Sequence, residues 1–228
     1  REWLIPLPFD LGDIHGAQHY FEGPSFLREA ATEDRFKSEA TDARIVHLAM
    51  HARVNDRAPL QSALYFQSPD STSTEDGVLT LGEIYQLALP AELAVVSACN
   101  TGYGQLATGE GVQSLANAFQ HAGCRSLLTH LWPANDQSAA QLIDHFYQGL
   151  ARGLSKDVAL QLAKQQYLKE ADPLAAQPFF WAGLVLIGDQ SPLTRTSWRS
   201  SAGRYGWALL LCLLMLALAF GGRRLIRP

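Results

Sequence analysis

The chain alternates short apolar runs, which suit β-strands, with longer segments whose apolar residues recur at helical spacing. Strands are predicted over residues 44–50, 63–67, 93–98, 125–131 and 181–187. Helices are predicted over residues 31–40, 80–87, 111–121, 136–152 and 155–169. Strands that alternate with helices are typical of an α/β fold. We therefore predict an α/β domain with a mostly parallel central sheet flanked by helices.

Polar side chains mark the starts of these helices. Thr32 and Thr80 stand where two of the shorter helices begin, and a threonine hydroxyl can accept a hydrogen bond from a free backbone N–H of the first turn. The two long helices, 136–152 and 155–169, are also expected to open with a capping side chain.

Residues 206–222 form an uncharged run made mostly of leucine and alanine. These 17 residues are close to the shortest length that spans a bilayer as a helix. Tyr205 and Trp207 stand at one end and Arg223 and Arg224 at the other, as interfacial residues do. A buried C-terminal core helix is the alternative, but no polar face is present to meet water. We therefore predict a transmembrane helix acting as a C-terminal anchor, with undetermined orientation.

The composition divides the chain into four parts. Residues 1–189 form the globular body, and residues 190–205 form a linker rich in serine, threonine, arginine and proline. The transmembrane segment 206–222 follows, and residues 223–228 form a short basic tail. Since the first residue is Arg1, the sequence is interpreted as an N-terminally truncated piece of a longer chain.

Charge and cysteine content exclude several classes of function. All 22 acidic residues and 12 of the 18 basic residues precede Arg195, so the body carries a net charge of −10. Such a body disfavours binding to the phosphates of nucleic acids. The three cysteines, Cys99, Cys124 and Cys212, have no CxxC spacing, which argues against a disulfide framework and a zinc site. We predict no metal and no cofactor.

Two of the predicted strands end on residues suited to nucleophilic catalysis. Cys99 follows the strand 93–98 and precedes a turn that contains glycines, and His51 follows the strand 44–50. If these strands are parallel neighbours, the thiol and the imidazole meet at one edge of the sheet, as a cysteine nucleophile and its base require. Backbone N–H groups of the turn can stabilise an oxyanion. The alternative is that Cys99 is a small core residue.

The other histidine and cysteine near these strands are assigned to the core. His47 lies inside the strand 44–50 and is predicted to be a core histidine bonded to the backbone. A metal site made of His47 and His51 would need a helix or a further ligand, so we do not predict one. Cys124, at a junction between helix and strand, is predicted to be packed rather than reactive.

Several motifs occur in an order that resembles a known family. They are EAATEDRF (residues 29–36), IVHLAMHA (45–52), VVSACNTG (95–102), GEG (109–111), AFQHAG (118–123), LWPAND (131–136) and PFFWAG (178–183). This set resembles the CHAT domain, a caspase-like family often found with tetratricopeptide repeats, from about residue 4 to residue 189.

The resemblance implies a caspase-haemoglobinase fold and a Cys–His dyad, with Cys99 as nucleophile and His51 as base. It also implies that the backbone N–H groups of Cys99 and Ala52 hold the oxyanion, and that the source is bacterial. Two residues depart from the family pattern, because Ala52 replaces the usual glycine and Met50 the usual threonine. If the glycine used a positive φ, alanine would be strained there.

Three functions are compatible with these residues. The first is a membrane-anchored cysteine endopeptidase that cleaves a protein substrate and stays latent until a partner activates it. The alternative is a non-catalytic CHAT scaffold at the membrane, and the third is another thiol enzyme such as an acyl transferase. The expected partners are a protein or peptide substrate, the lipid bilayer through residues 206–222, and an upstream repeat region or activating protein. We expect a single-pass membrane location with the CHAT domain in the cytoplasm.

Overall fold

The computed structural model describes residues 17–53, 55, 58–67, 73–97, 110–133 and 135–194, and of residues 110–114 only the backbone. The described part begins with a helical turn at residues 17–20. Except for Thr194, the described residues belong to one compact unit that ends at Leu193. Cys99, Cys212 and the segment 206–222 lie outside the described residues.

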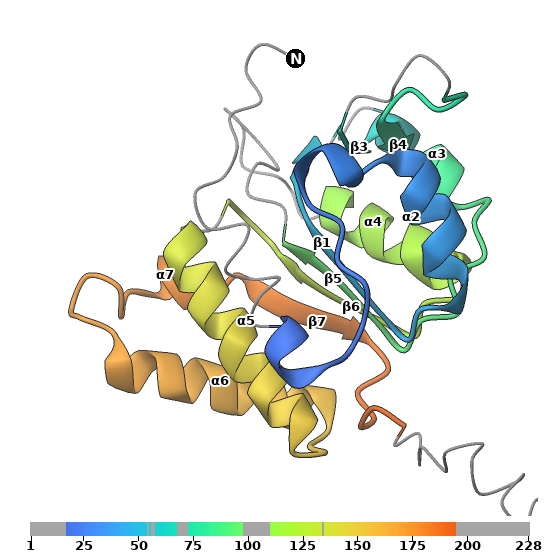
Figure 1. Ribbon diagram of the computed structural model, residues 1–228. Helices are drawn as coiled ribbons and strands as arrows, with labels where there is room; N and C mark the ends of the chain where they lie inside the picture. Colours follow the sequence, from blue (N-terminus) through green and yellow to red (C-terminus); the bar gives the residue numbers. More distant parts are fainter. Residues whose placement is uncertain are drawn as a thin grey trace, which may run out of the picture. The chain divides into compact units, whose positions relative to one another are not determined.

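A four-stranded central sheet carries the fold (Figure 1). Its strands, in spatial order, are β1 (Ile45–Ala49), β5 (Leu93–Ser97), β6 (Ser126–His130) and β7 (Leu184–Gly188). β1 pairs with β5 and β5 with β6 in parallel, whereas β6 and β7 are antiparallel. All five residues of β5 are buried, as expected for a strand with neighbours on both sides and helices on both faces.

A second, smaller sheet is entirely antiparallel. It contains β2 (His51–Arg53), β3 (Ala63–Tyr65) and β4 (Val78–Thr80) in that order. Met50 forms a bend between β1 and β2, so the chain passes directly from the central sheet into the small one. Sequence analysis predicted β3 but neither β2 nor β4, because three residues are too few to show a period of two.

Helices cover both faces of the central sheet (Figure 1). One face is covered by α2 (Glu33–Glu39), α3 (Leu81–Ile84) and α4 (Glu110–His121), and the other by α5 (Asp136–Ala151) and α6 (Lys156–Glu170). The short α7 (Pro178–Trp181) leads into β7, and 3₁₀ turns occur at η1 (Arg28–Ala30), η2 (Ala40–Asp42) and η3 (Pro59–Gln61). All five predicted helices are present.

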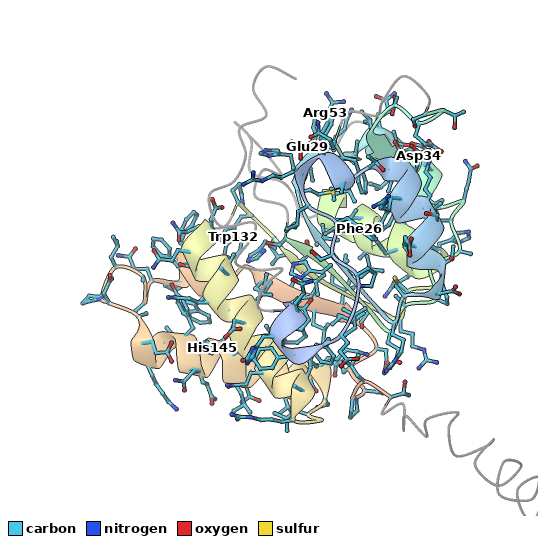
Figure 2. All side chains as sticks on the ribbon, viewed as in Figure 1. Phe26, Glu29, Asp34, Arg53, Trp132 and His145 are labelled. Atoms are coloured by element: carbon cyan, nitrogen blue, oxygen red, sulfur yellow. The ribbon has the colours of Figure 1, made fainter. Side chains whose placement is uncertain are left out.

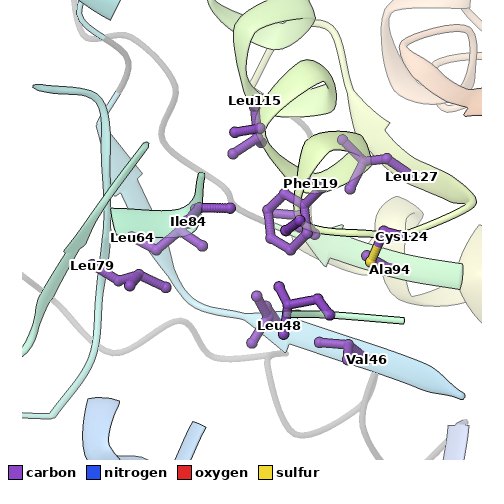
Figure 3. Packing of buried hydrophobic residues seen from close by; sticks show 14 of the residues in the cluster. Val46, Leu48, Leu64, Leu79, Ile84, Ala94, Leu115, Phe119, Cys124 and Leu127 are labelled. Carbon is purple, nitrogen blue, oxygen red and sulfur yellow. The ribbon is translucent and has the colours of Figure 1, made fainter. Parts of the chain in front are cut away.

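Alternating residues of the strands pack into two separate hydrophobic cores. Ala94 and Val96 of β5 belong to the core beneath α2, α3 and α4, whereas Leu93 and Val95 belong to the core beneath α5 and α6. Figure 3 shows the first core, in which Phe119 of α4 packs with residues of β1, β5 and β6. The sheet therefore has no solvent-facing side along β5.

The predicted caps are largely confirmed. Thr80 forms a capping box with Glu83, Thr32 accepts a hydrogen bond from the backbone N–H of Arg35, and Asn135 accepts one from Ser138 at the start of α5. The cap predicted for the second long helix is wrong, because the residue before α6 makes no side-chain hydrogen bond to the helix backbone.

The prediction of a mostly parallel sheet is corrected to a mixed one. In the central sheet two pairings are parallel and that of β6 with β7 is antiparallel, and the separate small sheet is entirely antiparallel. The direction of β7 has a simple cause. β6 ends at the carboxyl edge of the sheet. The chain then crosses to the opposite edge along α5 and comes back to the carboxyl edge along α6. A strand that starts at the carboxyl edge, as β7 does, must run antiparallel to β6.

The predicted transmembrane helix is also corrected, and with it the membrane location and the bilayer contact. No helix among the described residues combines the length and the apolar character needed to cross a bilayer. The expectation rested on residues 206–222, which lie outside the part of the chain that the structure describes.

Candidate active site

The register of β1 and β5 decides where the two predicted catalytic residues leave the sheet. The last aligned pair is Ala49 with Ser97. His51 follows Ala49 by two residues, and Cys99 follows Ser97 by two residues. Because β1 and β5 are parallel neighbours, both segments leave at the same carboxyl edge. The side chain of Cys99 itself is outside the described residues.

His51 stands at the start of the small sheet rather than at the end of the central one. It is half-buried and pairs with Tyr65 of β3. Ala52, the next residue, is buried and pairs with Leu64. Among the described residues other than glycine, positive φ occurs at Arg28 alone, so Ala52 has an ordinary strand conformation. The strain that a glycine-to-alanine replacement could have caused is absent.

His47 is half-buried rather than a full core residue, and its partner is a side chain rather than the backbone. The Tyr147 hydroxyl lies 3.1 Å from His47 Nδ1, and the two ring centroids are 5.7 Å apart. Nε2 is buried without a hydrogen-bond partner among the described residues. Burial lowers the pKa of His47 to about 4, so the imidazole is neutral at physiological pH.

Cys124 is packed, as predicted. Its side chain is buried in the first core, and Figure 3 shows it beside Ala94 of β5. Burial raises the pKa of the Cys124 thiol to about 11, and the backbone of Ala91 offsets this only in part. The thiolate is therefore scarce at neutral pH, which makes Cys124 unsuitable as a nucleophile.

Sequence analysis missed a second histidine at the carboxyl edge. His130 is the last residue of β6, and because Val96 aligns with Thr129, His130 follows on level with Ser97. It is buried, and its Nε2 has no hydrogen-bond partner among the described residues. Burial, with a contribution from the charge of Lys164, lowers the pKa of His130 to about 4. The strand predicted over residues 125–131 placed His130 inside the strand, whereas the observed β6 ends on it.

The motifs LWPAND and PFFWAG lie against each other in the fold. Trp132, labelled in Figure 2, donates a hydrogen bond from Nε1 to the carbonyl oxygen of Phe179 at 2.9 Å. Gly183 faces the same indole so closely that an added Cβ would lie 2.7 Å from it. The backbone N–H of Leu131 continues the pairing of β6 and β7 by donating to Gly183. The glycine is thus needed for the tryptophan to fit.

One acidic cluster has ligand atoms close enough together for a metal ion. Glu33, Glu75 and Glu83 form it, but the Lys37 ammonium lies 2.7, 2.6 and 3.2 Å from their carboxylates. Hydrogen bonds to the three carboxylates raise the pKa of Lys37 in spite of its partial burial. The ammonium occupies the place of a cation, and the cluster links α2 to α3 and to the residues before β4.

Comparisons with known proteins identify a family match and two relatives. The CHAT domain family matches residues 9–189. Tetratricopeptide repeat protein 28 of Homo sapiens is 27% identical over 226 residues, which cover 86% of this chain and 9% of that protein. The protein of the same name from Mus musculus is 26% identical over 197 residues, covering 73% and 8%. The chain thus spans less than a tenth of these relatives.

The family match covers most of the chain and all of the central sheet, so the chain belongs to the CHAT domain family. The resemblance deduced from the ordered motifs is therefore confirmed. Both relatives are mammalian, which gives no support to a bacterial source.

Proposed function

We propose that this chain is a cysteine endopeptidase domain with Cys99 as nucleophile and His51 as general base. The observation that carries the proposal is the parallel register of β1 and β5, because it directs the segments of His51 and Cys99 to one edge of the sheet. The ordinary backbone of Ala52 also supports it, since the departure from the family's glycine introduces no strain.

The proposed reaction has two stages. His51 accepts the proton of the Cys99 thiol, and the thiolate attacks the carbonyl carbon of the scissile peptide bond. The backbone N–H groups of Cys99 and Ala52 stabilise the oxyanion, and collapse of the intermediate releases the amine, which takes the proton from His51. Water, deprotonated by His51, then hydrolyses the thioester and restores the thiol.

We further propose that the domain is latent until a protein partner or an upstream region stabilises the site. His51 belongs to the small sheet, whereas β5, which leads to Cys99, belongs to the central sheet. The base and the segment that leads to the nucleophile therefore belong to two different sheets. Because the two relatives are named for tetratricopeptide repeats, an upstream repeat region is a suitable activator.

A non-catalytic interaction module is the second function that we consider. Two observations favour it. The chain covers less than a tenth of each relative, and the names of those proteins refer to repeats and not to peptidase activity. The two proposals differ in what they require of Cys99, because a scaffold does not need the thiol.

The first prediction tests the dyad by alkylation. In a Cys212→Ser background with the activating upstream region present, iodoacetamide should label Cys99 at neutral pH much faster than a free cysteine, with labelling followed by mass spectrometry of peptides. His51→Ala should slow the labelling of Cys99 at least about tenfold, because the thiolate loses its base. Cys124 is an internal control whose buried, high-pKa thiol should stay unmodified.

Catalysis is tested on a mixed peptide library incubated with the chain, followed by mass spectrometry. Cleavage that is lost in both Cys99→Ala and His51→Ala supports the peptidase. Binding of partners that is unchanged in Cys99→Ala, together with no cleavage even when the upstream region is added, would instead favour the interaction module.

A further inference from the structure

His130 presents a buried polar atom with no partner. The residue is at the carboxyl end of β6, between Ser97 of β5 and Leu184 of β7. Only 5% of its surface is exposed, and Nε2 has no hydrogen bond to any described residue. A buried polar atom without a partner destabilises the fold, so its retention suggests that a partner is supplied from outside.

Lys164 brings a positive charge to the same place. Its half-buried ammonium donates a hydrogen bond to the carbonyl oxygen of Ala182 at 3.4 Å and lies 5.8 Å from the centre of the Trp181 ring. Ala182 stands two residues before Leu184, the cross-strand partner of His130. The ammonium and the imidazole are close enough for the charge of Lys164 to lower the pKa of His130.

No carboxylate of the described residues neutralises this pair. Lys164 takes part in none of the ion pairs found in the described part of the chain. Burial lowers its pKa, and no acidic neighbour among those residues raises it again. A half-buried ammonium near a neutral imidazole with an unused nitrogen offers a charge and a hydrogen-bond donor to an anion.

We propose that His130 and Lys164 form a subsite that binds the carboxylate of an acidic side chain in the peptide substrate. Lys164 supplies the charge, and the imidazole of His130 donates a hydrogen bond from Nε2 to a carboxylate oxygen. Trp181 shields the ammonium from water on one side. We name this pair the His130–Lys164 subsite.

The position of the subsite links it to the proposed peptidase site. The identity of its ligand, a side chain of a peptide substrate, rests on the proposed peptidase function. His130 is level with Ser97, two residues before Cys99 in the sequence, and β5 and β6 are parallel neighbours. A carboxylate bound there would belong to a side chain close to the scissile bond. The expected substrate class is thus a protein cleaved next to aspartate or glutamate.

Binding can be measured without turnover in the full chain carrying Cys99→Ala and ¹⁵N-labelled histidine. The probes are capped pentapeptides that differ only at the central residue, which is aspartate, asparagine or lysine, with acetate as the source of a free carboxylate. We expect the aspartate peptide to bind at least about tenfold more tightly than the asparagine peptide and to shift the imidazole ¹⁵N signals of His130.

Variants of the two residues then test the roles separately. Lys164→Met should abolish the preference for aspartate, whereas Lys169→Met, an equal loss of charge at an exposed site on the same helix, should leave it unchanged. His130→Gln keeps a hydrogen-bond donor and should retain part of the preference. His130→Leu should lose that part while raising the melting temperature by a few degrees, since an unpartnered polar atom is removed.

Two results would overturn the inference. Equal affinities for the aspartate and asparagine peptides would exclude a carboxylate subsite, and binding of acetate alone would show a site for a free anion rather than for a peptide. If the peptides are cleaved by the chain with Cys99 intact but without regard to acidic residues, the subsite fails and the peptidase stands. If the aspartate peptide binds as expected but is not cleaved by the chain with Cys99 intact even when the upstream region is added, the peptidase fails and the subsite stands.

Discussion

His47 and His130 are neutral residues whose surroundings make protonation unfavourable, and this couples folding to pH. Burial lowers the pKa of His47 to about 4, whereas an unfolded histidine titrates near 6.5. Between these values the unfolded chain binds the proton and the folded chain does not. Stability is therefore lost as the pH falls from about 6.5 to 4, by up to about 3 kcal/mol for this residue.

The second prediction follows for the variant His47→Gln. Urea unfolding at pH 4, 5, 6 and 7 should show a shallower loss of stability on acidification than the wild type, by up to about 1.4 kcal/mol per pH unit. Tyr147→Phe removes the hydrogen bond to His47 but keeps the imidazole, so its pH dependence should follow that of the wild type. Identical slopes for His47→Gln and wild type would contradict the assignment of a neutral buried imidazole.

At the scale of single residues, the sequence predicts which side chains are buried better than it predicts which side chains they contact. Cys124 and His47 were assigned to the core from their places at a junction between helix and strand and inside a strand; Cys124 is buried, and His47 is half-buried with its Nε2 atom fully covered. The partner of His47 could not be predicted, because Tyr147 lies 100 residues away on α5. His130 was not identified because the predicted strand extended to residue 131 and placed it in the strand interior, whereas β6 ends on it.

Among the elements, α5 and α6 pack closely together at Gly149, where a glycine of α5 faces Ala159 of α6. A Cβ added at Gly149 would lie 2.9 Å from the Cβ and 3.1 Å from the Cα of Ala159. Because one of these atoms is backbone, α6 would have to move as a unit. The third prediction is that Gly149→Ala destabilises the fold by about 1–3 kcal/mol in urea unfolding, although alanine favours the helix itself by about 1 kcal/mol.

The matched control for this prediction is Gly82→Ala in α3. Its added Cβ would find no atom closer than 3.7 Å, so only the gain in helix propensity remains and stability should stay equal or rise. If both glycine variants gain stability, the close contact between α5 and α6 does not limit the packing. If both lose stability equally, the loss does not depend on this contact.

The elements themselves were largely predictable, and their pairing was not. Periodicity identified every strand of the central sheet and all five helices, with ends that differ by a few residues. Periodicity did not predict the direction of β7, although the two consecutive helices α5 and α6 already require β7 to run antiparallel to β6. β2 and β4 were missed because their stability comes from pairing with β3 rather than from a local pattern.

The unit as a whole combines two sheets of unequal size. β5 is buried along its length between two strands and two helical layers. The strands of the small sheet have three residues each, and Arg53 at the end of β2 is exposed. Local openings that leave the rest of the fold intact are most easily made where few apolar contacts are lost. The small sheet, which carries His51, is the region expected to open in this way.

The last prediction concerns hydrogen exchange of the native protein. Amides of β2 and β3 should exchange through a local opening that depends little on low concentrations of urea, whereas amides of β5 should exchange only through global unfolding. Because the small sheet holds the base and the central sheet leads to the nucleophile, such an opening separates the dyad while the domain stays folded. An activating partner should then slow the exchange of β2 and speed the alkylation of Cys99. Exchange of β2 that is as slow as that of β5 in the isolated chain would rule out this source of latency, because the dyad would already be held in place.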